Sequence, residues 1–191
     1  RWNLLGIFFR IWGYACLLAF QFSWFGYFRQ PQKFSYGTIV IMLTGGVISN
    51  IAAATISQKW SLKDPKGLAF VPSIMCFLAA ITAFFIFSSQ SFLMAMIFYG
   101  VYFTLGDGFV APVLSMFSIA APPDCKGQVM GYFITVLSIS TLLMPLVVSA
   151  MIGTNTTHEH MTFVFMINTI IPNAIGGICF LIASFGFADE V

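Results

Sequence analysis

Six apolar runs, each long enough to cross a bilayer, constrain this chain more than any other feature of its sequence. A hydrocarbon core roughly 30 Å thick requires about 20 apolar residues in a helix. Backbone groups in lipid must be hydrogen-bonded within their own segment, which favours helices over strands here. The sequence therefore predicts an all-α integral membrane protein, a single bundle of six transmembrane helices. The expected spans are about 3–28, 36–57, 68–88, 92–120, 128–152 and 162–187.

The composition supports the same class. Only 7% of the 191 residues are charged and 59% are hydrophobic, whereas soluble domains carry roughly 25% charged residues. The few charges form no basic patch, which argues against nucleic acid as a partner and leaves the lipid bilayer. The four cysteines are scattered singly and have no metal-ligand spacing. Because the chain starts at Arg1 rather than Met, we expect it to be a piece of a longer protein.

A lone carboxylate, Asp107, lies in the middle of the fourth run, between two glycines and five residues before Pro112. At 100° per residue, small and polar residues share a sector of this helix about 80° wide. Such a stripe is typical of tight helix–helix contacts, but it also suits the wall of a water-filled cavity. The carboxylate favours the cavity. The stripe consists of Gly100, Thr104, Asp107, Ala111, Ser115 and Ser118.

The first run carries a similar stripe, in which Asn3, Arg10, Tyr14 and Gln21 lie within about 40° of one another. Arg10 either extends to the membrane surface along its own stem or faces the interior of the bundle. Arg10 and Asp107 are the only charges well inside the apolar runs, and their signs are opposite. We predict a solute-binding or coupling site composed of Arg10, Tyr14, Gln21, Thr104 and Asp107.

The remaining runs predict packing rather than chemistry. Small residues recur at every fourth position of the second run, and the fifth run opens with a G-x-x-x-G pattern; both indicate packing seams. The third and sixth runs are more uniformly apolar and suit the lipid-facing periphery. The two small-residue ladders are Gly45, Ser49, Ala53 and Ser57 in the second run, and Gly127, Gly131, Thr135 and Ser138 in the fifth.

Lysine and arginine in the short loops predict the orientation. One side collects Arg1, Lys59, Lys63, Lys66 and Lys126, and the other only two basic residues. We therefore expect both ends of the chain to be cytoplasmic. The glycosylation sequon that begins at Asn155 falls on the opposite side, as it should.

The sequence gives little support for an enzymatic function. The sequence contains no G-x-S-x-G, H-E-x-x-H or phosphate-binding glycine loop. His158, Glu159 and His160 form a short polar loop, and two histidines so close together make a poor metal site. We expect no enzyme activity, no metal site and no cofactor.

Two stretches carry a resemblance to a known family. The stretch "GGVISNIAAATISQKWSLKDPKG" resembles the second helix of a major facilitator superfamily half and the basic loop after it. The stretch "GDGFVAPVLSMFSIAAPPDCKGQVMGYF" resembles the fourth helix and the start of the fifth in spinster-like and related protist members. Gln58 stands where the family typically has an aspartate, which favours the C-terminal half, in which this motif is degenerate.

The resemblance implies a fold of two inverted three-helix repeats, in which the first and fourth helices line a central cavity. It also implies a second six-helix bundle as partner and a small organic or amphipathic solute, with a leaning towards lipid-like molecules or organic anions. We therefore expect half of a secondary active transporter that works by alternating access. A non-transporting subunit whose polar faces dock a partner is one alternative, and a channel is another.

Overall fold

The computed structural model describes residues 1–154 and 156–190, without the side chains of residues 120, 123 and 187–190. It confirms an all-α chain with six helical spans that are long and apolar enough to cross a membrane. The fourth span consists of two helices joined by a single 3-10 turn. The elements are α1 Trp2–Phe25, η1 Gly26–Phe28, α2 Pro31–Ser61, α3 Gly67–Ser88, α4 Phe92–Gly106, η2 Asp107–Phe109, α5 Val110–Ala120, η3 Pro123–Cys125, α6 Lys126–Ile152 and α7 His158–Glu190.

Local signals at the turns explain where several helices begin and end. Arg29 adopts a left-handed conformation with φ 54° after η1, and Pro31 then opens α2, where a missing N–H is tolerated. Ser91 caps α4, because its hydroxyl accepts a hydrogen bond from the Met94 N–H at 3.3 Å. These short turns keep consecutive spans antiparallel.

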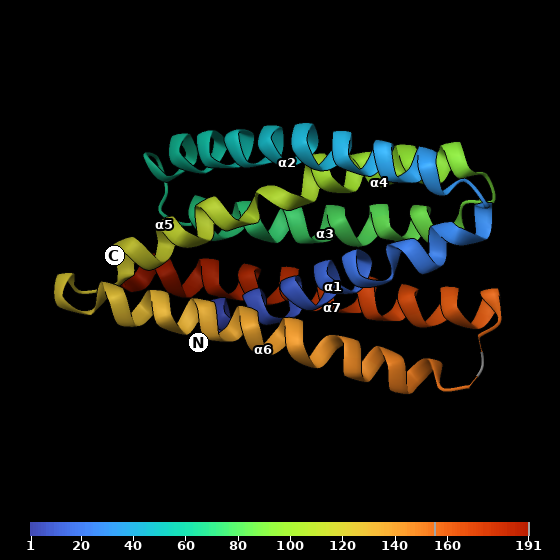
Figure 1. The fold of residues 1–191 in the computed structure, drawn as a ribbon. Coiled ribbons are helices and arrows are strands. Elements are labelled where there is room, and N and C mark those ends of the chain that lie inside the picture. Colours follow the sequence, from blue (N-terminus) through green and yellow to red (C-terminus); the bar gives the residue numbers. More distant parts are fainter. Residues whose placement is uncertain (155, 191) are drawn as a thin grey trace.

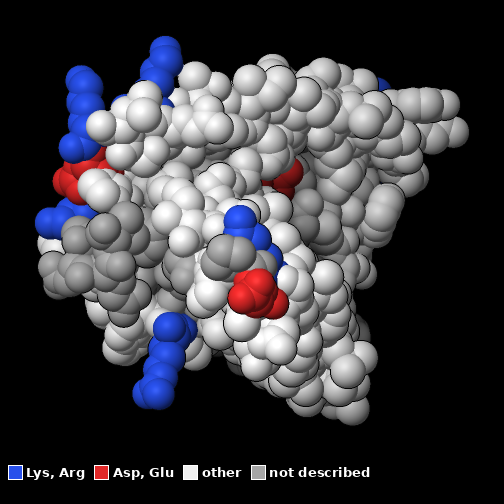
Figure 2. Space-filling view, turned by 90° about the vertical axis from the view of Figure 1, so that its left-hand side faces the viewer, with Lys and Arg blue, Asp and Glu red and all other residues white. Residues whose placement is uncertain are grey.

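The helices form a central group flanked by two arms (Figure 1). In the central group α7 packs closely against both α1 and α3, and α3 also packs against α4. The arm at the top of Figure 1 is α2, which packs on α4, η2 and α5; the arm at the bottom is α6, which packs mainly on α1. Figure 2, turned about the vertical axis, shows a hollow between these two arms with an acidic side chain set back inside it.

The buried core divides into two main clusters. The larger one is strongly aromatic, and the Phe25 ring stacks on Phe34 at 4.3 Å and meets Tyr99 edge-on at 5.6 Å. The smaller one gathers Phe109, Phe180 and aliphatic side chains towards the other end of the bundle. Arg10 comes from α1 between residues of the smaller cluster, and η2 lies beside it.

The expectation that the third span lies at the periphery is wrong for this chain. In the most apolar stretch of α3, 61% of the residues are buried, the highest share of the six spans; the shares for α2 and α6 are 22% each. Small side chains on α3 let neighbouring helices approach from several sides, and a helix that is apolar all round suits such a position. These residues are Ser73, Cys76, Ala79, Ala80 and Ala83.

The two small-residue ladders have opposite outcomes. The ladder on α2 is a packing seam as predicted: all four of its residues are buried, and Gly45 contacts Thr104 so closely that an added Cβ would lie 2.9 Å from the hydroxyl. The ladder on α6 is not a seam in this chain. An added Cβ on Gly127 or Gly131 would meet no described atom within 4 Å.

Candidate functional site

The candidate site is built around the interruption of the fourth span. Backbone groups at such a break need partners, because lipid supplies none. Two side chains from neighbouring helices bind there. Arg10 on α1 donates from Nη2 to the carbonyl oxygen of Gly106 at 2.7 Å, and the Gly108 N–H donates to Ser49 Oγ on α2 at 2.8 Å. The break is thus held from both sides by side chains of the first and second spans.

Gly108 is needed for this close approach. A Cβ at this position would lie 2.2 Å from the backbone oxygen of Ser49 and 2.8 Å from Cβ of Ala53. Because the first of these atoms belongs to the backbone, no rotamer change could relieve the contact. The small residues of the α2 ladder and the glycine of η2 therefore let the two elements pack backbone to backbone.

Arg10 is fully buried and does not reach the membrane surface. Its Nη1 donates to the Tyr102 hydroxyl and to Asn173 Oδ1, both at 2.9 Å. The guanidinium also lies 5.0 Å from the centre of the Phe109 ring, a distance at which a cation and an aromatic face attract each other. Of the two alternatives for Arg10, the structure therefore excludes the extended one and places the side chain inside the bundle.

Asp107 is half-buried and points towards α2, where an added Cβ on Gly46 would lie 3.0 Å from Oδ2. Its carboxylate interacts with the Tyr14 side chain and with the charge of Arg10. In the described part of the chain, however, Arg10 and Asp107 form no ion pair; the Nη atoms of Arg10 donate to uncharged oxygens instead. The carboxylate is therefore near a cation but not neutralised by direct contact with it.

The other two predicted residues are not bound to this group. Gln21 is eleven residues after Arg10, about 16 Å along the helix, and accepts a hydrogen bond from the Tyr99 hydroxyl within the aromatic cluster. Thr104 donates to the Gly100 carbonyl oxygen of its own helix at 2.9 Å and faces α2. The structure thus brings Arg10, Tyr14 and Asp107 together and leaves Gln21 outside, while Thr104 lies one turn before Asp107 with its hydroxyl bound to its own helix.

Sequence reasoning missed Tyr102 and Asn173, the two side chains that bind Arg10. Tyr102 belongs to the larger, more aromatic face of the fourth span, opposite the small and polar stripe, and this aromatic face is the one that packs on α1. The small and polar stripe is the half-exposed face instead. Asn173 follows Pro172 inside α7, and an amide next to a proline in the middle of an apolar span was a sequence signal that could have found it.

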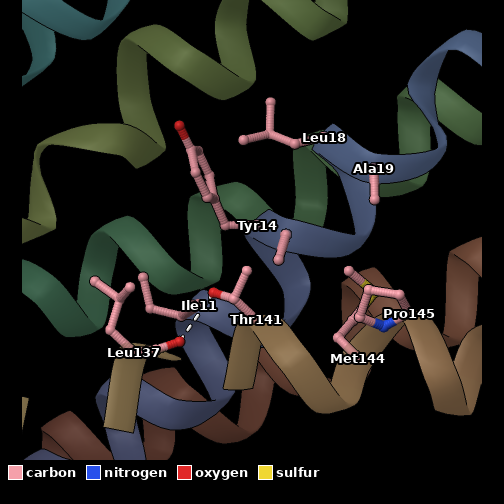
Figure 3. A pocket seen from close by; sticks show the side chains of 9 residues that line it. Ile11, Tyr14, Leu18, Ala19, Leu137, Thr141, Met144 and Pro145 are labelled. Carbon is pink, nitrogen blue, oxygen red and sulfur yellow. Dashed lines mark hydrogen bonds between the residues drawn. The ribbon is translucent and has the colours of Figure 1, made fainter. Parts of the chain in front are cut away.

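A groove with a volume of about 380 Å³ lies between α1 and α6 next to this group. Apolar side chains form most of its wall, among them Leu18, Leu137 and Met144. Figure 3 shows Tyr14 at its edge, with the hydroxyl directed away from the α6 residues and towards the ribbon of the fourth span. Tyr14 therefore belongs both to the groove and to the surroundings of Asp107.

The predicted glycosylation site at Asn155 lies outside the described residues. Comparison with known proteins adds no family: no protein-family model matches this chain, and the search of curated proteins finds no similar sequence. The site thus stands on its geometry alone, as a carboxylate, a phenol and a buried guanidinium gathered at a helix break inside a chain with six candidate membrane spans.

Proposed function

We propose that this chain is one six-helix half of a secondary active transporter that moves a small organic solute by alternating access. The observation that carries the proposal is Asp107, a half-buried carboxylate at the interruption of a membrane span. A charge in the membrane interior is costly and marks solute or ion pathways. Discontinuous helices near the middle of the membrane are a recurring way to build such sites.

The arrangement of the helices supports a relation to the major facilitator superfamily. In a half of that fold the first and fourth spans line the cavity, and the second and fifth flank it. Here α1 and the α4–η2–α5 span meet at the candidate site, with α2 and α6 on either side. The second six-helix bundle that this fold requires would close the hollow, and the apolar surfaces of α2 and α6 are available for it.

Transport by the whole protein tests the role of Asp107. We expect Asp107→Asn to abolish concentrative uptake driven by a pH gradient in proteoliposomes, while solute exchange continues, because exchange needs no net binding or release of the proton. Asp124→Asn, in the exposed turn before α6, removes the same charge away from the site and should leave uptake unchanged. Normal pH-driven pumping by the Asp107→Asn protein would show that this carboxylate is not the coupling group.

A non-transporting membrane subunit is the second candidate. The observation that favours it is the glycine ladder at the start of α6, which faces open space and suits contact with another membrane helix. A protein that inserts and binds partners but carries no solute across proteoliposomes would support this candidate over a transporter.

A further inference from the structure

The two charged groups at the break differ in how accessible they are to a solute. Asp107 is half-buried, whereas Arg10 has no exposed surface. Both Nη atoms of Arg10 are engaged by uncharged oxygens, and the buried Nε finds no partner among the described residues. Because the side chain has no exposed surface, an incoming anion would have to open the packed interior to reach it. Arg10 is therefore a group of the core, and Asp107 is the charge with exposed surface.

The surroundings of Asp107 leave its negative charge available. From α1 the carboxylate meets Arg10 and Tyr14, of which only Arg10 is a cation. From α2 the carboxylate lies beside Gly46, which carries no charge. The carboxylate lies close against α2 here, since an added Cβ on Gly46 would lie 3.0 Å from Oδ2, and this contact brings no positive charge to it. A bound solute can therefore supply the direct ion-pair partner that the described chain does not.

The groove between α1 and α6 supplies the rest of a binding site. Its volume of about 380 Å³ lies within the usual range for small organic ligands, about 300–1,000 Å³. Thr141, one of its two hydroxyl-bearing residues, already donates to the Leu137 carbonyl oxygen at 2.9 Å. The other, Tyr14, lies at the edge of the groove and also interacts with Asp107, and aromatic faces attract organic cations.

We infer that the solute is an organic cation with an apolar body: its ammonium group pairs with Asp107, and its body lies in the groove beside Tyr14. The inference rests on the proposed transport function and names its substrate class. It reverses the leaning towards organic anions that the sequence resemblance implies, because the only guanidinium at this site is enclosed in the core.

Binding to the full-length protein in lipid nanodiscs tests the charge preference. The probes are matched aryl-alkyl pairs of opposite charge, beginning with benzyltrimethylammonium and phenylacetate. We expect the ammonium members to bind at least about tenfold more tightly than the carboxylates, the effect of one charge-assisted contact. Asp107→Asn should remove this preference, and Asp124→Asn should keep it.

The outcomes separate this inference from the proposed function. Equal or tighter binding of the carboxylates, or no binding by any ammonium member, would overturn the cation site, even where the Asp107→Asn protein fails to fold, since the comparison uses the unaltered protein. Concentrative uptake of an anion would overturn the inference and leave transport standing. Saturable ammonium binding without any flux would uphold the site and overturn transport.

Discussion

Arg10 is bound by oxygen atoms from two other spans, and this makes it a structural centre of the bundle. Its three hydrogen bonds reach Tyr102, Gly106 and Asn173. Each of these acceptors is buried, so each depends on the guanidinium as much as the guanidinium depends on it. The residue thus joins α1 to α4 and α7 at a single point.

We expect Arg10→Met to lower the free energy of unfolding by about 3–5 kcal/mol, because three buried acceptors lose their donor at once. Arg10→Lys should be nearly as damaging, since a single ammonium cannot reproduce the planar fork of donors. Thermal unfolding in detergent measures the loss. Arg29→Met, in the exposed turn after α1, is the matched control. An Arg10→Met protein that unfolds at the temperature of the unaltered one would refute this account.

The contacts of Arg10 also show which features of single residues the sequence could predict and which it could not. The proximity of Arg10 to the region of Asp107 was predictable, because isolated charges inside apolar spans are costly unless other polar or charged groups lie beside them. The direct partners were not, since Tyr102 looks like any other aromatic residue of an apolar face. Hydrogen bonds between helices depend on how each helix rotates about its axis, and a single sequence does not reveal that rotation.

Among the elements, the fourth span differs most from the helix that its sequence predicted. A helix of 29 residues was expected over 92–120, and the chain instead forms α4, η2 and α5. Pro112 indicated a disturbance near this point, but the 3-10 turn precedes it and includes Asp107 itself. The six spans followed from hydropathy because burial in lipid dominates their energetics. The break did not, because it depends on Arg10 and Ser49 from other helices.

Gly108→Ala tests whether the close packing of η2 on α2 is essential. A methyl group 2.2 Å from the Ser49 backbone oxygen must push the two elements apart, and overpacking of this kind costs about 1–3 kcal/mol. We expect a clearly lower unfolding temperature. Gly131→Ala on α6 adds the same methyl group in open space and should be neutral or slightly stabilising. Equal effects of the two substitutions would contradict the packing that we describe.

At the scale of the whole molecule, the basic residues of the loops are divided unequally between the two ends of the bundle. The turns that join α2 to α3 and α5 to α6 lie at the end where α1 begins, and Figure 2 shows lysine and arginine side chains around it. Basic residues in short loops favour the cytoplasmic side. We therefore predict that this end of the bundle faces the cytoplasm and that both termini of the chain lie on the same side.

Cysteine labelling with an impermeant reagent measures this orientation. In a Cys125→Ser background, Lys63→Cys should react only after the cells are permeabilised, and Arg29→Cys, in the turn at the other end, should react in intact cells. The remaining three cysteines are buried and can stay in place. Labelling of Lys63→Cys from outside intact cells would show that the molecule is inserted the other way round.

The oxygens that bind Arg10 have a consequence for biosynthesis. Tyr102 and Gly106 belong to the fourth span and Asn173 to the sixth, so the ribosome makes all three long after it has made α1. An arginine in a lone helix at the bilayer centre costs about 2.5–3.5 kcal/mol on insertion scales. Until these partners have been synthesised and inserted, it is therefore energetically favourable for α1 to remain beside the insertion machinery rather than to move freely into lipid. Among the six spans, α1 is thus synthesised first and is among the last to reach its final contacts.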